Sequence, residues 1–233
     1  SKSVVRVTFN RPKVLNALNE EMIAETTDIY TLQKQLEKVP SMEGLELSSK
    51  VTTEKSYFFG DEKAKYKVAV LDIGVKRNIL KCLSDRDCYL QVFPMHASYQ
   101  EMNAWNPNGF FLSNGPGDPS AMPEVIEEVK KITENSNPVF GICLGHQALA
   151  LSEGIATYKM HNGHRGINHP VINLSSGKAE VTSQNHGFGI SEEDIKNNPN
   201  VEVTHVNLND NTVEGAGLNF HRCFMKEYHP SMK

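Results

Sequence analysis

From residue 66 onward, short β-rich segments alternate with amphipathic helical segments, and this rhythm constrains the fold more than any other feature of the chain. Residues 66–74 (YKVAVLDIG) form a β-rich segment that ends in glycine, and residues 75–85 (VKRNILKCLSD) place apolar residues at helical spacing. The alternation continues as strand, strand, helix, strand and helix over 88–95, 109–119, 121–135, 138–145 and 146–154. Strands and helices at such intervals predict parallel pairing through right-handed crossovers.

The sequence changes character after residue 156. β-rich segments follow one another there, with Gly, Asn and Asp turns between them and little helix. These segments are TYKM (157–160), HPVINL (169–174), AEVTSQ (179–184), VEVTHVNL (201–208) and CFMKEYH (223–229). The predicted fold class is therefore α/β, with a mostly parallel central sheet flanked by helices and an antiparallel extension whose last strand returns to the core.

The first sixty residues do not share this pattern. Residues 20–39 are helical in pattern, and residues 40–60 are polar and rich in turn residues. We expect an N-terminal helical and linker extension over 1–60 and a single domain over 61–233. Residues 4–22 (VVRVTFNRPKVLNALNEEM) resemble the opening strand and turn of the enoyl-CoA hydratase family, but that family's oxyanion-loop glycines do not follow, so we expect no catalysis from this segment.

Charge and composition argue against several classes of function. A net charge of −4 and a pI near 6.1 indicate no basic surface for nucleic acid or an anionic membrane. No apolar run approaches the ~20 residues that span a bilayer. The four cysteines lie far apart, which disfavours a disulfide scaffold or a Cys-rich zinc site. We expect a cytoplasmic protein that binds neither nucleic acid nor membrane.

Cys143 lies between Gly141 and Gly145, where a predicted strand gives way to a predicted helix. This G-x-C-x-G pattern is the thiol counterpart of the nucleophile elbow G-x-S-x-G. Ligands of parallel sheets bind at the carboxyl ends of the strands. The N–H groups and the dipole of a helix beginning at Leu144 favour a thiolate and can bind an oxyanion. A buried structural cysteine is the alternative, which the pattern alone leaves open.

A thiol nucleophile needs a base, commonly a histidine from a distant part of the chain. His229 follows the last predicted strand, His186 lies in a predicted turn (QNHGF), and His146 follows the elbow. Three further histidines cluster in HNGHRGINHP: His161, His164 and His169. Their Gly-rich neighbours and the absence of a nearby carboxylate or thiol favour a loop, so we expect no metal site.

Residues 112–119 (LSNGPGDP) form a second Gly-rich strand end. They are typical of a turn, and also of a backbone wall whose N–H groups face an anionic or tetrahedral species. Neither a Walker loop nor a dinucleotide fingerprint is present in this segment, because it lacks G-K-[ST] and G-x-G-x-x-G.

Together these motifs resemble the class I (triad-type) glutamine amidotransferases, and within them the small, glutamine-hydrolysing subunits of carbamoyl-phosphate synthetases. GICLGHQ (141–147) carries the class, and DIGVKRNIL (72–80), NGHRGINHPV (162–171) and QNHGF (184–188) carry the narrower branch. The resemblance extends from about residue 36 to residue 230 and implies a flavodoxin-like core. It implies hydrolysis of L-glutamine to glutamate and ammonia in arginine and pyrimidine biosynthesis, with a large ATP-dependent subunit as partner. No cofactor is implied for this chain, because ATP and Mg²⁺ belong to that large subunit.

The resemblance also assigns roles to single residues. Cys143 becomes the nucleophile and His229 the general base, with the N–H groups of Leu144 and Gly117 as the oxyanion hole. The positions that match the family's glutamine contacts are Gly115, Gly117, Leu144, Gln147, Asn185, Gly187 and Phe188.

Three departures from the family keep other hypotheses open. Ser231 stands where the family has the glutamate that orients the histidine, the family's final helix is missing after it, and the family's separate N-terminal domain is not present. A hydroxyl cannot offset an imidazolium charge as a carboxylate does, so we expect weakened hydrolysis and a domain truncated at its C-terminal end. The alternatives are an inactive amidotransferase-like binding subunit and an amidotransferase that serves another synthetase.

Overall fold

The computed structural model describes residues 30, 34, 37, 39–135 and 137–218, and the backbone of residues 223–226. The chain forms two compact units, residues 1–42 and residues 43–233. Nearly all of the first unit lies outside the described residues, including the segment that resembles enoyl-CoA hydratases. Residues 43–60 belong to the same compact unit as the sheet. Our expected domain boundary after residue 60 stays a prediction.

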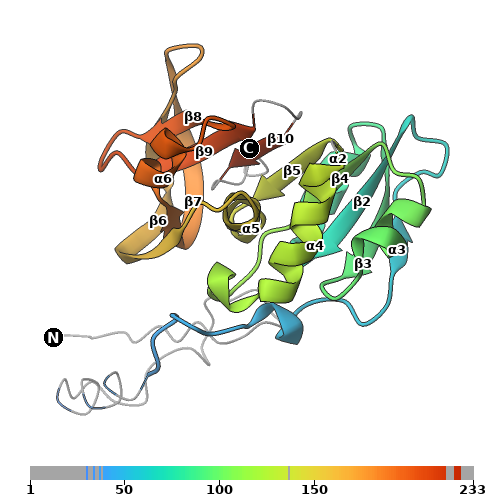
Figure 1. Ribbon diagram of the computed structural model, residues 1–233, viewed down its shortest axis with the longest axis horizontal. Helices are drawn as coiled ribbons and strands as arrows, with labels where there is room; N and C mark the ends of the chain where they lie inside the picture. The colour runs from blue at the N-terminus through green and yellow to red at the C-terminus, as the bar shows by residue number, and fades with distance from the viewer. Residues whose placement is uncertain are drawn as a thin grey trace, which may run out of the picture. The chain divides into compact units, whose positions relative to one another are not determined.

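The second unit is built on one ten-stranded sheet with the strand order β1-β3-β2-β4-β5-β10-β9-β8-β6-β7 (Figure 1). Its parallel half contains β3 (Cys88–Pro94), β2 (Tyr66–Asp72), β4 (Gly109–Leu112), β5 (Val139–Ile142) and β10 (Cys223–Lys226). These strands are short apolar runs because helices cover both of their faces. The predicted parallel core is confirmed, as is the return of the last strand to pair with β5.

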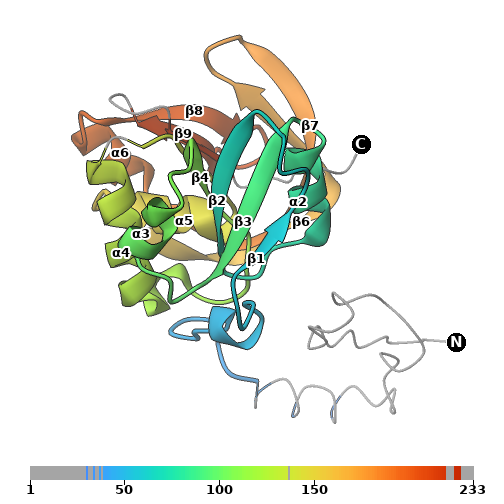
Figure 2. The same ribbon diagram turned by 90° about the vertical axis from the view of Figure 1, so that its right-hand side faces the viewer.

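Helices cover the two faces of the parallel half unequally (Figure 2). On one face, α3 (Tyr99–Ala104), α4 (Pro123–Glu134) and α5 (Leu144–Ser152) share a core with alternate residues of the strands, such as Leu71 and Leu112. On the other face, α2 (Arg77–Ser84) buries Ile79 and Leu80 against Val70 and Phe111. The result is a three-layer α/β/α core, as the strand–helix alternation predicts.

The antiparallel half contains β6 (Thr157–Asn173), β7 (Lys178–Ile190), β8 (Val201–Asn207) and β9 (Val213–Leu218), with α6 (Glu192–Asn197) after β7. It lies beyond β5 and α5 in Figure 1. Its existence is confirmed, but two local predictions are wrong. The expected loop at 161–168 is part of β6, with register shifts on both sides of His164, and the expected turn at 184–188 lies inside β7.

Several short elements were not predicted from the sequence: η3 (Ser48–Lys50), β1 (Tyr57–Phe59), α3, α6 and β9. Ser120 precedes the helical segment 121–135, and a serine there favours an N-cap role, but this expectation is wrong. Ser120 lies in a 3-10 turn, η4 (Pro119–Ala121), and its N–H donates to Asp118 Oδ1 at 2.9 Å. The helix α4 begins after Met122, which provides no side-chain cap, with Pro123 at its first position. Proline fits there because the first-turn N–H groups have no partner within the helix.

Glu128 of α4 joins two helices, and its pKa predicts a dependence of stability on pH. Its Oε2 accepts the Tyr99 N–H at 2.6 Å, and its Oε1 accepts from Lys131 Nζ at 2.6 Å. Burial opposes ionisation of Glu128, but these hydrogen bonds outweigh it and hold the pKa of the carboxyl below its usual value. A lowered pKa stabilises the folded state above the unfolded value near ~4.3, and that stabilisation is lost as pH falls through the folded value.

We therefore expect Glu128→Gln to lower the free energy of unfolding by about 1 kcal/mol at neutral pH, with a difference that shrinks below pH ~4. Urea unfolding of both chains at several pH values measures this. Glu127→Gln is the matched control, because Glu127 is exposed on the same helix. An equal loss in both variants, or a loss independent of pH, would contradict the role of Glu128.

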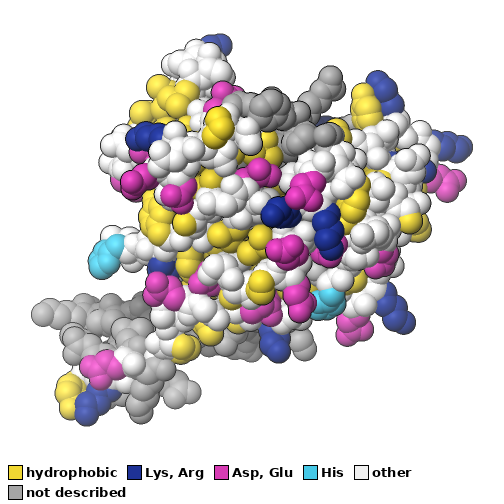
Figure 3. Space-filling view, in the orientation of Figure 1, with side chains coloured by type: hydrophobic (Ala, Val, Ile, Leu, Met, Phe, Trp, Pro, Cys, Tyr) yellow, Lys and Arg dark blue, Asp and Glu magenta, His cyan; other side chains and the backbone are white. Residues whose placement is uncertain are grey.

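Figure 3 shows acidic and basic side chains interspersed with hydrophobic ones over the face that it draws. Some charged side chains of the chain form ion pairs, such as Lys131–Glu128 at 2.6 Å. Within the described residues, none of the helices is both long enough and apolar enough to cross a bilayer.

Candidate active site

Cys143 forms the junction between β5 and α5, and its backbone is strained. Its φ is 53° and its ψ is −111°, a combination that L-residues rarely adopt. Among the described residues, the other non-glycine residues with positive φ are Asp87, Asn106 and Asn211, types that favour this region. Strain of this kind costs about 1–3 kcal/mol and concentrates at functional sites. The predicted nucleophile elbow is present in the backbone.

The two glycines that flank Cys143 are required by close backbone packing. A Cβ at Gly141 would lie 2.6 Å from the carbonyl carbon of Gly145. A Cβ at Gly145 would overlap the carbonyl of Leu112 on β4. The start of α5 therefore packs directly onto β4 and β5, which explains the G-x-C-x-G spacing physically. The Cys143 side chain is 8% exposed and packs in the cluster that includes Phe111 and Ile142.

The Gly-rich segment after β4 lies beside the first residue of α5. A Cβ at Gly115 would lie 2.8 Å from Leu144 Cδ2 and would overlap the Ile73 carbonyl. Gly117 has φ 105°, which also favours glycine. Leu144 is the first residue of α5, so its N–H has no carbonyl partner within the helix. The structure thus brings Gly115 and Leu144 together, as the predicted backbone wall requires.

Residues 43–53 hold this Gly-rich segment in place. Asp118 Oδ2 accepts the Gly44 N–H at 2.8 Å, and the Asp118 N–H donates to the Leu45 carbonyl at 2.9 Å. Glu46 and Gly117 form an isolated antiparallel bridge. Sequence reasoning treated these residues as a linker, because their polar composition carries no sign of a partner some seventy residues away.

Gln147 and Phe188 are joined directly. Gln147 Nε2 donates to the Phe188 carbonyl oxygen at 2.9 Å, and the Gln147 side chain is almost fully buried. This bond ties the first turns of α5 to β7. Lys159 Nζ lies 5.8 Å from the centre of the Phe188 ring. Two of the predicted glutamine contacts therefore meet beside the elbow.

Asn185 and Gly187 lie on the same strand but on its other face. Asn185 is exposed and pairs with Arg165 of β6, and a Cβ at Gly187 would lie 3.3 Å from the Arg165 guanidinium. The burial of β7 alternates here, with His186 and Phe188 turned inward. The four residues 185–188 thus form a strand segment rather than the predicted turn.

The predicted base His229 and the orienting residue Ser231 lie outside the described residues. The backbone of β10 is described as far as Lys226, which pairs with Ile142, the residue before Cys143. Because β10 is parallel to β5, both strands end at the same edge of the sheet. His229 comes three residues after this point in the sequence.

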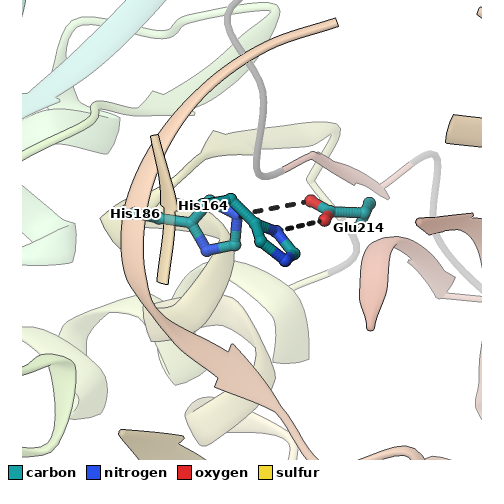
Figure 4. Close-up of side chains that lie close together, drawn as sticks. All are labelled: His164, His186 and Glu214. Carbon is teal, nitrogen blue, oxygen red and sulfur yellow. Dashed lines mark hydrogen bonds and ion pairs between the residues drawn. The ribbon is translucent and has the colours of Figure 1, made fainter. Parts of the chain in front are cut away.

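A buried cluster of ionisable side chains lies in the antiparallel half: His164 on β6, His186 on β7 and Glu214 on β9 (Figure 4). Desolvation opposes ionisation of Glu214, but hydrogen bonding to His186 and the histidine charges outweigh it and lower the pKa of this carboxyl. Of the three histidines clustered in the sequence, only His164 belongs to this group, because His161 is exposed and His169 makes a ring contact with His164. His186, weighed in the sequence as a base, is the second member. Sequence reasoning missed the cluster because its members come from three separate strands.

The family model of class-I glutamine amidotransferases matches residues 69–232. This chain belongs to that family. The match covers the elbow, the Gly-rich segment, β7 and the position of His229. The predicted family is thereby confirmed.

Curated relatives of this amidotransferase carry a narrower name. This chain is 43% identical over 205 residues to a carbamoyl phosphate synthase small chain of Chlorobaculum tepidum. The aligned residues cover 87% of this chain and 56% of that protein. It is 49% identical over 173 residues to a carbamoyl phosphate synthase small chain of Acinetobacter baylyi, with 74% and 45% covered. The chain spans about half the length of these relatives.

Solved structures support the fold of this amidotransferase. A glutamine amidotransferase from Thermotoga maritima superposes with a TM-score of 0.57 at 14% identity, over 71% of this chain and 76% of that one. At such low identity the likeness concerns the fold alone, and it confirms the predicted α/β fold class.

Proposed function

We propose that this chain hydrolyses L-glutamine to glutamate and ammonia through a thioester on Cys143. The observation that carries the proposal is the strained backbone of Cys143 at the carboxyl end of β5, in a chain of the class-I amidotransferase family. A thiol at a strained turn, where a strand ends and a helix begins, is suited to nucleophilic attack on an amide.

The chemical steps follow from a Cys–His pair. His229 takes the thiol proton, and the Cys143 sulfur attacks the side-chain carbonyl carbon of glutamine. The N–H groups of Leu144 and Gly117 donate to the oxyanion that develops. His229 then protonates the departing nitrogen, which leaves as ammonia. Water, deprotonated by His229, attacks the γ-glutamyl thioester, and this step releases glutamate and restores the thiol.

The remaining assignments concern contacts with the substrate. Gly115, Gln147, Asn185, Gly187 and Phe188 are proposed to contact glutamine. The Gln147–Phe188 bond at 2.9 Å supports this grouping, because it joins the helix of the nucleophile to the strand that carries the other contacts. The reaction needs no cofactor in this chain, since thiol and imidazole supply the nucleophile and the proton transfers.

We further propose that the ammonia passes to a large, ATP- and Mg²⁺-dependent subunit that makes carbamoyl phosphate. The names and identities of the curated relatives support this assignment, at 43% and 49% identity. On this proposal the chain works in a cytoplasmic heterodimer that supplies arginine and pyrimidine biosynthesis.

A second candidate is a subunit that docks on such a synthetase but no longer hydrolyses glutamine. Ser231 favours it, because a serine stands where the family's orienting glutamate is expected. Cysteine nucleophiles depend less than serine on such help, so we favour weakened hydrolysis over none.

A glutamine analogue with an alkylating group in place of the amide tests the proposal. We expect one equivalent of label on Cys143, located by peptide mass spectrometry, and protection by excess L-glutamine. Cys82 and Cys88 are free and half-buried, so they serve as internal controls for general thiol reactivity. Label spread evenly over the cysteines, or none on Cys143, would refute glutamine chemistry and favour the docking subunit.

A further inference from the structure

The cluster of His164, His186 and Glu214 has a composition and burial that an ordinary core does not explain. All three side chains are at least nine-tenths buried, and Glu214 is wholly so. Their ligand atoms lie within 4.8 Å of one another. Figure 4 shows both imidazole rings turned toward the carboxylate. Charged and imidazole groups of this kind are costly to bury unless they are paired or bind a metal ion.

The inner atoms of the cluster have the spacing of metal ligands. His164 Nδ1 lies 3.2 Å from His186 Nε2, and only one proton can lie between two ring nitrogens at that distance. His164 Nδ1 is 2.8 Å from Glu214 Oε1, and His186 Nε2 is 3.5 Å from Glu214 Oε2. Tetrahedral zinc with bonds of about 2.0–2.1 Å separates its ligand atoms by roughly 3.3 Å.

The outer nitrogens of both rings already have acceptors. His164 Nε2 lies 2.8 Å from Asp210 Oδ2, and His186 Nδ1 lies 2.9 Å from the Phe188 carbonyl oxygen. A carbonyl can only accept, so His186 Nδ1 carries a proton, and a neutral His186 ring would present the lone pair of Nε2 to an ion in the cluster. Carboxylate and carbonyl partners of this type orient the histidine ligands of metal sites.

Glu214 is held in the same way. Asn207 Nδ2 donates to Glu214 Oε1 at 2.9 Å, which fixes the plane of the carboxylate. Glu214 Oε2 has only a long contact among the described residues, with His186 Nε2 at 3.5 Å. A fully buried carboxylate oxygen left in this state is expensive, and a bound cation would satisfy it.

We propose that His164 Nδ1, His186 Nε2 and a carboxylate oxygen of Glu214 form a zinc site. Gln184 Oε1, 3.3 Å from His186 Nε2, or a water molecule completes the tetrahedron. The ion would join three strands, β6, β7 and β9, and His186 would link it to the Phe188 carbonyl. Because the ion cross-links strands of the sheet, its role is structural. Asp210, whose side chain is 45% exposed, marks the route from solvent to His164. This site does not depend on the proposed hydrolysis of glutamine.

Metal binding by the full chain tests the proposal. After chelator treatment and dialysis against buffered Zn²⁺, we expect one zinc per chain by elemental analysis and a raised thermal midpoint. Co²⁺ as a substitute should give the visible absorption of a tetrahedral site. Glu214→Gln, which keeps the side-chain shape, should abolish stoichiometric binding. Asp210→Asn should weaken it about 10–100-fold, as other losses of an outer partner do.

His161→Asn is the matched control, because His161 is an exposed histidine on the same strand, outside the proposed ligand set. It should bind zinc as the parent chain does. Asp210 is largely solvent-accessible, so its variant remains informative even if Glu214→Gln fails to fold. No zinc retained by the parent chain, or full retention by Asp210→Asn, would overturn the site and assign the cluster to a buried imidazolium–carboxylate network.

Discussion

Cys143→Ala is expected to abolish the release of ammonia from glutamine while leaving the chain folded. The alanine side chain has no atom that can form the thioester, and removal of a catalytic nucleophile lowers kcat by roughly 10⁶-fold in a well-characterised hydrolase. The backbone strain at φ 53° stays in place, since alanine relieves none of it. The substitution removes one buried sulfur, so the free energy of unfolding should change by no more than about 1 kcal/mol.

A coupled assay of glutamate formation, together with urea unfolding of the same samples, measures both quantities. Cys82→Ala is the matched control, because Cys82 lies on α2, is half-buried and is not part of the hydrophobic cluster that contains Cys143. It should keep the parental rate. If Cys143→Ala hydrolyses glutamine at the parental rate, the proposed function is refuted, even though the chain belongs to the amidotransferase family.

The parallel half of the fold could be predicted because each of its units carries its own local signals. The run of residues 66–74 ends at a glycine, and the helix after it has one apolar face. The elbow is equally local, since Gly141, Cys143 and Gly145 are close in sequence and meet the same two strands. Such features need no knowledge of distant partners.

The antiparallel half was harder because pairing between strands overrides local turn preferences. Asn185 and Gly187 are typical turn residues, yet both lie within β7, which pairs with β6 on both sides of Gly187. Register shifts around His164 absorb glycines that would otherwise end the strand, as β-bulges do. Burial alternates from Thr182 to Phe188, a strand pattern that the mostly polar residues of this segment do not reveal in the sequence.

The parts of the site that sequence reasoning missed all depend on long-range contacts. Leu45 and Asp118 meet only once the sheet has formed, and neither has a motif that indicates the other. The same holds for Glu214, which becomes a neighbour of His164 and His186 through the pairing of β6 with β7 and β8, and of β8 with β9. Their chemistry was visible in the sequence, but their proximity was not.

Gly145→Ala is expected to destabilise the fold more than any other single methyl addition at the elbow. The new Cβ would overlap the Leu112 carbonyl oxygen and approach Leu112 Cβ to 2.8 Å. Both atoms belong to Leu112, which is fixed in β4, so the helix has to move away from the sheet. Overpacking of this kind costs about 3 kcal/mol. Urea unfolding of the variant and the parent chain gives the difference directly.

Gly145→Ala should also lower the rate of glutamine hydrolysis, even in the molecules that remain folded. Displacement of α5 moves the Leu144 N–H away from the oxyanion, and a shift of about 1 Å at a reacting centre can cost about 10²-fold in rate. Gly154→Ala is the control at the other end of the same helix, where a Cβ meets no atom within 4 Å and only φ 78° opposes alanine. It should cost about 1 kcal/mol and leave hydrolysis unchanged. Equal losses in the two variants would mean that the contact of α5 with β4 does not position the oxyanion donors.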